Sequence, residues 1–463
     1  MRPAPLFDPK NTLLQINAAD RATLLPCGGY PPDRGFQHDH DVGLAPTPSR
    51  RGFVTGTRLT LLALAAGLIG GAVMTHLQLA VLDTALGIAD PVGKLWLAGL
   101  TMTIVPLVFG LLVTGIAKAT ETAADSGVAT RAVTWFALLL LGSCLFAAFA
   151  TSLALDVWPV PPQAAHLNPG APPPTLAPPA DWIAGIIPTN PIKALADSAM
   201  VPLVVFALLF GLAVSRIELS LRKAILTLFH ALVETMLVIV RWVLWLAPLG
   251  VLALSFGVGA RVGLSAAGAL VHYVLIAAGA CLLATLLAYV AAILAGRISL
   301  LAFAKAAVPA QVVALSTQSS LASLPAMIAA APALRVPESA AAIVLPLAVS
   351  LFRAASAAAN VAVAVYLGHL HGVTLGPGTV LLGALVAVPI SLAAVGLPAQ
   401  VSFFATIAPV CLAMGVPLVL LPLLMAVETI PDIFRTIGNV TADLAVLRIA
   451  GTPRLTEPTP VQA

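Results

Sequence analysis

Polar side chains interrupt the apolar pattern of this chain most densely near its end. An apolar run from Val416 to Ala426 leads into a segment where polar residues recur every one to four positions: Glu428, Asp432, Arg435, Thr436, Asn439 and Asp443. At about 100° per residue these side chains fall in one stripe roughly 100° wide. The pattern predicts a membrane-spanning helix whose polar stripe faces the inside of a bundle.

Such a stripe is costly in a membrane. A carboxylate or guanidinium near the bilayer centre costs about 2.5–3.5 kcal/mol on insertion scales. Three acids and an arginine on one face indicate a binding site or ion pathway. Internal ion pairing that only holds helices together is the alternative, and the hydroxyl and amide groups on the same face favour the binding site.

Six earlier apolar segments are each long enough to cross a membrane. They run over about 58–82, 95–118, 131–157, 194–217, 223–258 and 262–295. A proline-rich loop over 159–181 separates the third from the fourth. Lys and Arg cluster in every second loop, which predicts that both termini are cytoplasmic.

Two later apolar segments are broken at their centres by small polar residues and proline. The segment 302–331 is broken at 316–325, and the segment 380–412 is broken at 391–398. Each half is too short to cross about 30 Å of hydrocarbon. We therefore expect two re-entrant helical hairpins, with a helix over 338–366 between them. Interrupted segments in matching positions of a repeat indicate a transporter's substrate site.

Composition restricts the class of protein. Of 463 residues, 60% are hydrophobic and only 9% are charged, which predicts an all-α polytopic membrane protein. The net charge of +4 comes largely from Lys and Arg at helix ends, so we expect no nucleic-acid partner. The four cysteines are scattered and show no metal-ligand spacing. We expect neither a metal site nor a cofactor.

The two ends of the chain differ from its middle. Residues 1–50 are rich in Pro, Asp and Arg and lack a sustained apolar run, so we expect a disordered N-terminal tail. Residues 451–463 form the C-terminal tail. No nucleophile elbow, zinc-protease helix or phosphate loop is present, which argues against an enzyme. A sensor that binds without translocating, and a channel, remain alternatives to a transporter.

Several motifs together resemble the glutamate/aspartate transporter family (dicarboxylate/amino acid:cation symporters). The resemblance covers about residues 55–450 and rests on the hairpin motif 316–325, Gly396-Leu397-Pro398 and the polar stripe, with further matches at 104–109, 188–191 and 247–250. It implies a homotrimer with inverted repeats and an elevator mechanism. Helices 1–5 would lie within 55–258, of which the third would join the moving transport domain. Residues 259–450 would form the rest of that domain.

The resemblance also assigns roles to residues. Asp432 would take the substrate's ammonium and Arg435 a side-chain carboxylate, which a planar guanidinium holds by paired bonds. Thr436 and Asn439 would bind the α-carboxylate. The remaining substrate-binding candidates lie on the hairpins and on the helix between them: Ser319, Ser320, Gly396 and Ser356.

One motif departs from the family. Where the family carries Asn-Met-Asp-Gly-Thr, this chain has Phe352-Arg353-Ala354-Ala355-Ser356, and Ala394 replaces a threonine in the second hairpin. The sodium ligands are largely lost, although Asp443 and Asn439 survive. We therefore predict that Arg353 is a built-in cation that pairs with Asp443, so that transport is sodium-independent.

The coupling and the substrate follow from the same residues. Transport would be proton-coupled, with Glu428 as the proton carrier, or uncoupled. The alternative is that Arg353 only neutralises Asp443 in a poorly active paralogue. Asp432 favours an amino acid, because a succinate-type substrate has no ammonium to pair with it. Aspartate or glutamate is the first expectation, and a C4-dicarboxylate the second.

Overall fold

The computed structural model describes residues 50–125, 127–161, 187–263, 265–393 and 399–452. The chain divides into two compact units, residues 1–49 and 50–463, and all of the described residues belong to the second. The expected N-terminal tail, apart from residue 50, lies outside the described residues. So do Gly396 at the second hairpin tip and nearly all of the C-terminal tail.

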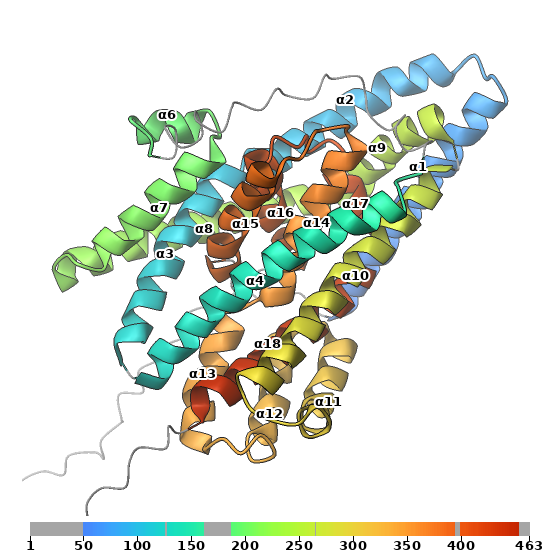
Figure 1. Ribbon diagram of the computed structural model, residues 1–463. Coiled ribbons are helices and arrows are strands. Elements are labelled where there is room, and N and C mark those ends of the chain that lie inside the picture. The colour runs from blue at the N-terminus through green and yellow to red at the C-terminus, as the bar shows by residue number, and fades with distance from the viewer. Residues whose placement is uncertain (1–49, 126, 162–186, 264, 394–398, 453–463) are drawn as a thin grey trace, which may run out of the picture. The chain divides into compact units, whose positions relative to one another are not determined.

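All regular secondary structure in the described residues is α-helix (Figure 1). In the first part of the chain the helices are α1 (Arg50–His76), α2 (Leu82–Thr101), α3 (Ile104–Asp125), α4 (Gly127–Val157), α6 (Pro191–Ala196), α7 (Met200–Val214), α8 (Leu219–Trp245) and α9 (Ala247–Val262). In the second part they are α10 (Ser265–Leu294), α11 (Leu300–Thr317), α12 (Ser320–Ala330), α13 (Glu338–Leu351), α14 (Ala354–Leu370), α15 (Pro377–Ala393), α16 (Ala399–Ala413), α17 (Leu421–Val427) and α18 (Thr429–Gly451).

The all-helical prediction is confirmed for these residues. Seven helical stretches are long and apolar enough to cross a membrane by length and composition. α18 is not among them, because its charged stripe lowers its hydropathy. One of the seven is α11, the first arm of a predicted hairpin, so the count of eight spans and two hairpins stays a prediction.

Several helix boundaries differ from those expected. The expected helix over 95–118 is divided into α2 and α3 at residues 102–103, and the expected helix over 194–217 is divided into α6 and α7 at residues 197–199. The segment 223–258 is not one helix, since α8 ends at Trp245 and α9 begins at Ala247. Pro248 lies in the first turn of α9, where a missing N–H costs no helical hydrogen bond. The first helix ends at His76, and α2 begins at Leu82, well before the expected residue 95. The first turns of α2 contain charged residues, so they do not form part of a continuous apolar run.

Both predicted hairpins form as pairs of packed helices. α11 and α12 are joined by Gln318, whose φ is 52°, and by Ser319, and the two arms pack together. α15 and α16 also pack together, and the residues that join them, 394–398, lie outside the described part of the chain. The two arms of each hairpin thus lie side by side as expected.

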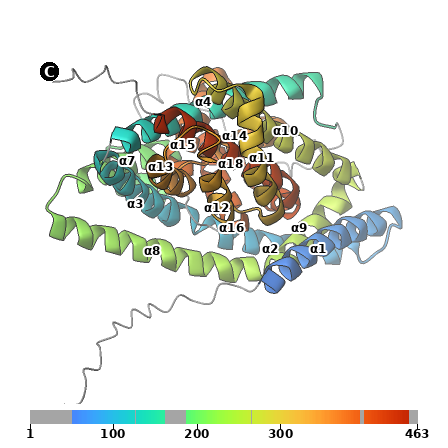
Figure 2. The same ribbon diagram turned by 90° about the horizontal axis from the view of Figure 1, so that it is seen from below.

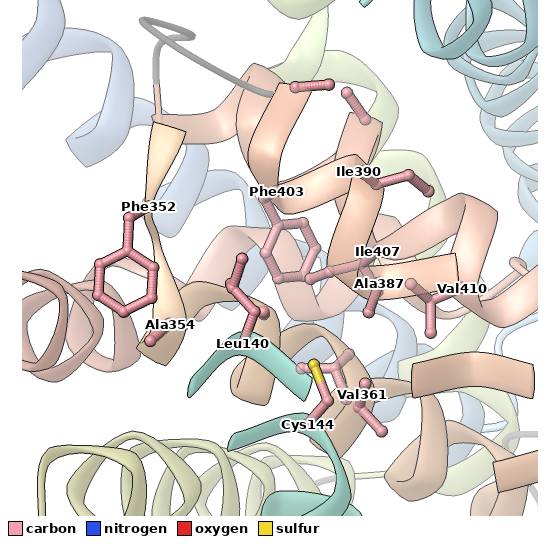
Figure 3. Packing of buried hydrophobic residues seen from close by; sticks show 14 of the residues in the cluster. Leu140, Cys144, Phe352, Ala354, Val361, Ala387, Ile390, Phe403, Ile407 and Val410 are labelled. Atoms are coloured by element: carbon pink, nitrogen blue, oxygen red, sulfur yellow. The ribbon is translucent and has the colours of Figure 1, made fainter. Parts of the chain in front are cut away.

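The helix expected over 338–366 is broken in the middle. α13 ends at Leu351, and Phe352 (φ −112°, ψ 111°) and Arg353 (φ −134°, ψ 65°) are not helical before α14 begins. The ring of Phe352 stacks on Phe136 of α4, with centroids 4.6 Å apart. Figure 3 shows the extended backbone at Phe352 beside apolar residues of α4, α14, α15 and α16. The break is therefore packed into the core.

α18 is the central helix of this unit. It packs against α4, α10, α11, α12, α13 and α14, and Figure 2 shows it surrounded by most of these helices. Its side chains from Gly438 to Leu447 are all buried. A second set of contacts joins α1 and α2 to α9, and α3 to α7 and α8, with α8 along one edge in Figure 2.

α17 and α18 do not form one continuous helix. Pro431 has no N–H to donate to the carbonyl of Val427, so the helical ladder is interrupted where α18 starts. Glu428 lies at this junction. The interruption brings its side chain into the interior at the start of the polar stripe.

Candidate functional site

The structure buries the whole polar stripe of α18. Exposed fractions are 5% for Glu428, 9% for Asp432, 3% for Arg435, 1% for Asn439 and 0% for Asp443, and Thr436 is also buried. The prediction that the stripe faces the bundle interior is confirmed. The hydroxyl of Thr436 donates to the carbonyl of Asp432 at 2.9 Å, as hydroxyls within helices commonly do.

Arg435 is held by two partners from different elements. Its Nη2 lies 2.5 Å from Oε1 of Glu428, seven residues earlier and therefore two turns away on the same face. Tyr273 of α10 donates to the other oxygen of Glu428 at 2.8 Å. Nη1 of Arg435 donates to Oδ1 of Asn360 at 3.5 Å. The contact with Glu428 is an ion pair without hydrogen-bond geometry, so Nε and Nη2 of Arg435 and Oε1 of Glu428 have no hydrogen-bond partner in the described part of the chain.

Asn360 and Tyr273 are site residues that sequence reasoning missed. Asn360 is fully buried in α14, and its Oδ1 also accepts from the hydroxyl of Thr406 in α16 at 3.3 Å. Its Nδ2 lacks a hydrogen-bond partner among the described residues. An amide in an otherwise alanine- and valine-rich run was the available signal for Asn360. Tyr273 carried no comparable signal, because a single tyrosine in an apolar helix is common.

Asn439 joins α18 to the broken helix. Its Oδ1 accepts from the backbone N–H groups of Ala355 (3.0 Å) and Ser356 (3.2 Å), and its Nδ2 donates to the Ser356 hydroxyl at 2.8 Å. The two N–H groups belong to the first turn of α14 and have no partner within their own helix. The amide expected to bind an α-carboxylate is thus engaged as a cap for α14, and so is Ser356.

Arg353 lies in the break between α13 and α14 and is half-buried. Its Nη1 donates to the hydroxyl of Ser402 in α16 at 3.3 Å. Its charge acts on both Asp432 and Asp443. The guanidinium therefore stands within electrostatic reach of two carboxylates from the polar stripe.

The expected direct pair between Arg353 and Asp443 is not formed. No ion pair joins them among the described residues, and both carboxylate oxygens of Asp443 are buried there without a hydrogen-bond partner. The guanidinium instead donates to Ser402 on the second hairpin. The interaction with Asp443 is thus electrostatic at longer range.

The first hairpin supplies its serines beside α18. Ser319 is the N-cap of α12, and its hydroxyl accepts from the N–H of Ala322 at 3.2 Å. Ser320 is the first residue of α12, and both serines are half-buried. Because α11 and α12 both pack against α18, the serine-bearing hairpin belongs to the surroundings of the stripe.

The site holds three acids and two guanidinium groups, so its formal charge with every group ionised is −1. At the helix break, Phe352 and Ala354 stand where the family pattern has an amide and a carboxylate, and neither side chain offers an oxygen ligand. Bound cations prefer oxygen ligands, and a fixed guanidinium repels them. The residues at the break therefore do not fit a sodium ion.

Comparison with known proteins places the chain in a family. The model of the family described as the sodium:dicarboxylate symporter family matches residues 57–451. A proton/glutamate-aspartate symporter of Escherichia coli is 27% identical over 382 residues, which cover 78% of this chain and 84% of the relative. A proton/sodium-glutamate symport protein of Bacillus subtilis is 24% identical over 376 residues, which cover 76% and 83%.

A C4-dicarboxylate transport protein of Deinococcus radiodurans is 27% identical over 175 residues, which cover 36% of this chain and 39% of the relative. The family match extends over nearly the same residues as the motifs found in the sequence. The chain therefore belongs to the sodium:dicarboxylate symporter family and is a multi-pass membrane transporter, not an enzyme.

Proposed function

We propose that this transporter carries aspartate or glutamate across the cytoplasmic membrane without sodium, with Arg353 as a built-in cation. The observation that carries the proposal is the position of Arg353. It lies in the break between α13 and α14, and its charge acts on Asp432 and Asp443. A guanidinium is always charged, and because it belongs to a side chain it cannot leave the site as a bound ion can. It would supply permanently the positive charge that a bound ion supplies transiently.

The substrate class rests on Asp432 and Arg435. A buried carboxylate and a buried guanidinium on one face suit an ammonium and a carboxylate of the same ligand. The E. coli relative is named for glutamate and aspartate, in line with this choice. A C4-dicarboxylate is the second candidate, which the name of the D. radiodurans relative favours. A C4-dicarboxylate would leave Asp432 without an ammonium partner.

The coupling is proposed to involve a proton or no ion at all. Glu428 is the candidate proton carrier, because it is buried, lies at the start of the stripe and contacts Arg435 directly. The name of the E. coli relative includes a proton, which supports a proton for this chain.

The helix contacts support a division into moving and static parts, although α3 also packs against α4 and α15. We propose that α1, α2, α3, α7, α8 and α9 form a homotrimeric scaffold. The scaffold is thus drawn from the 55–258 part of the chain, in which α4 is assigned to the transport domain instead. α4 packs against α10, α14, α15 and α18 and would move with them as the transport domain. The arms of both hairpins belong to that domain, and both termini would be cytoplasmic.

Uptake of labelled aspartate into liposomes containing the purified chain tests the proposal. Uptake is expected with sodium, potassium or choline outside at the same rate, and an inward pH gradient is expected to accelerate it if a proton is coupled. A strict sodium requirement would contradict the built-in cation. Binding without accumulation would indicate a sensor, and a steady current without substrate would indicate a channel.

A further inference from the structure

The guanidinium assigned to the substrate's side-chain carboxylate already holds a carboxylate. Oε1 of Glu428 lies 2.5 Å from Nη2 of Arg435, and both residues are at least 95% buried. An arriving acidic side chain would place a second carboxylate on the same guanidinium. Two carboxylates in one buried site do not both remain ionised, and one takes up a proton.

We propose that Glu428 is an internal substitute for the substrate's side-chain carboxylate and that its protonation selects the substrate class. With Glu428 ionised, the site takes zwitterionic amino acids that have uncharged side chains. With Glu428 protonated, Arg435 is released and the site takes aspartate or glutamate. This inference rests on the proposed function, because it keeps Asp432 and Arg435 as the substrate's partners.

The arrangement holds Glu428 in place as a ligand would be held. Tyr273 donates a hydrogen bond to Oε2 at 2.8 Å, while Oε1 forms the ion pair with Arg435 and accepts no hydrogen bond from the described residues. Asn360 supports the guanidinium from α14 at 3.5 Å. Nε of Arg435 keeps an unused donor among the described residues, which leaves the guanidinium able to bind a carboxylate in another orientation.

Charge balance supports both substrate classes. A zwitterionic amino acid with a neutral side chain adds no net charge to a site in which Glu428 neutralises Arg435. Aspartate or glutamate adds one negative charge, and the proton on Glu428 adds one positive charge. The two loaded forms therefore carry the same formal charge, so the cost of moving the loaded site through the membrane is similar for both.

The charged and titratable neighbours of Glu428 are few. On its own helix they are Arg435 and Asp432, and on α10 they are Tyr273 and Cys281. α14 and α16 contribute uncharged groups, Asn360 and Thr406. No charge from α1 or α9, which pack on α17, acts on Glu428 in the described part of the chain. A change of pH is therefore expected to alter the charge beside Arg435 chiefly by protonating or deprotonating Glu428.

The test is equilibrium binding of labelled aspartate and labelled serine to the purified full chain at about pH 5.5 and about pH 8, on either side of the range where a buried glutamate titrates. In the unaltered protein, aspartate affinity is expected to fall about tenfold for each pH unit over which Glu428 is ionised. Serine affinity is expected to change in the opposite direction. Glu338→Gln, the same substitution at an exposed position, is expected to leave both profiles unchanged.

Glu428→Gln removes the competing charge. This variant is expected to bind aspartate equally well at both pH values and to lose serine binding, because Arg435 is then unpaired when serine is bound. Tyr273→Phe tests the same idea with a smaller change. Loss of its hydrogen bond to the ionised carboxylate is expected to move the change of preference to higher pH.

Two results would overturn the inference and leave the proposed function intact. They are an aspartate affinity that ignores pH in the unaltered protein, and a Glu428→Gln variant with unchanged aspartate and serine profiles. Absence of aspartate binding at every pH in the unaltered protein would instead overturn the proposed function, and the inference with it. The two failures are therefore distinguishable.

Discussion

In the proposed function, a single arginine takes the place of a bound ion. Arg353 occupies the helix break, donates to Ser402 and acts electrostatically on Asp432 and Asp443. A buried carboxylate without a compensating charge is strongly unfavourable. The proposed role of Arg353 is therefore to compensate the charge of these two acids rather than to contact the substrate directly.

Arg353→Met removes this fixed charge while keeping a long side chain. Because this charge acts on the two acids at longer range, its loss is expected to weaken aspartate binding by about 1.4 kcal/mol, a fall of about tenfold in affinity. Isothermal titration of the purified variant measures the change, with Arg241→Met on the exposed face of α8 as the matched control. Recovery of binding on adding sodium would show that the arginine merely fills an ion site that can still form.

At the scale of elements, α18 is positioned by contacts that leave no spare room. A Cβ added at Gly438 would lie 2.6 Å from the Cβ of Ala355 and 2.8 Å from the hydroxyl of Thr285. Asn439, the next residue, caps α14 from the side. The break between α13 and α14 is thus fixed against α18 by close packing and by hydrogen bonds together.

Gly438→Ala should destabilise the protein, because α18 must shift away from α10 and α14. Overpacking of this kind costs about 1–3 kcal/mol. Thermal unfolding in detergent measures it, and Gly279→Ala on α10 is the control, since a Cβ there meets nothing within 4 Å. Equal melting temperatures for the two variants would show that α18 is not tightly packed at this point.

Asn439→Ala removes the cap of α14. Two buried N–H groups lose their acceptor, at a cost of about 1–3 kcal/mol for each group left unsatisfied. We expect a lower melting temperature than for Ser356→Ala, which removes only the side-chain hydrogen bond. The reverse order would mean that water replaces the cap and that Asn439 serves the substrate directly.

At the scale of the whole molecule, the second compact unit contains two sets of helices with different partners. α8 belongs to the outer set, and Trp242 and Trp245 on it are 68% and 82% exposed. Such rings suit either lipid or a second copy of the chain. The proposed homotrimer predicts a detergent-solubilised particle whose protein mass is three times 47.2 kDa. Light scattering measures this mass, and the mass of a single chain would contradict the trimer.

The sequence predicted the long helices, the two hairpins and the burial of the polar stripe, because each depends on local apolarity or on helical periodicity. It did not predict the ends of α8 and α9 or the start of α2, where apolarity continues across a break or charges interrupt a helix. It identified Arg353 through a departure from a family motif. It could not show that Ser402 meets Arg353, that Asn360 meets Arg435 or that Tyr273 meets Glu428, because those contacts join distant segments.

The central claim is that a fixed guanidinium replaces sodium in this site. The dissociation constant of aspartate, measured at increasing sodium with choline held as the balancing cation, tests it most directly. The account predicts the same dissociation constant at every sodium concentration. A dissociation constant that falls in proportion to sodium, or more steeply, would contradict it.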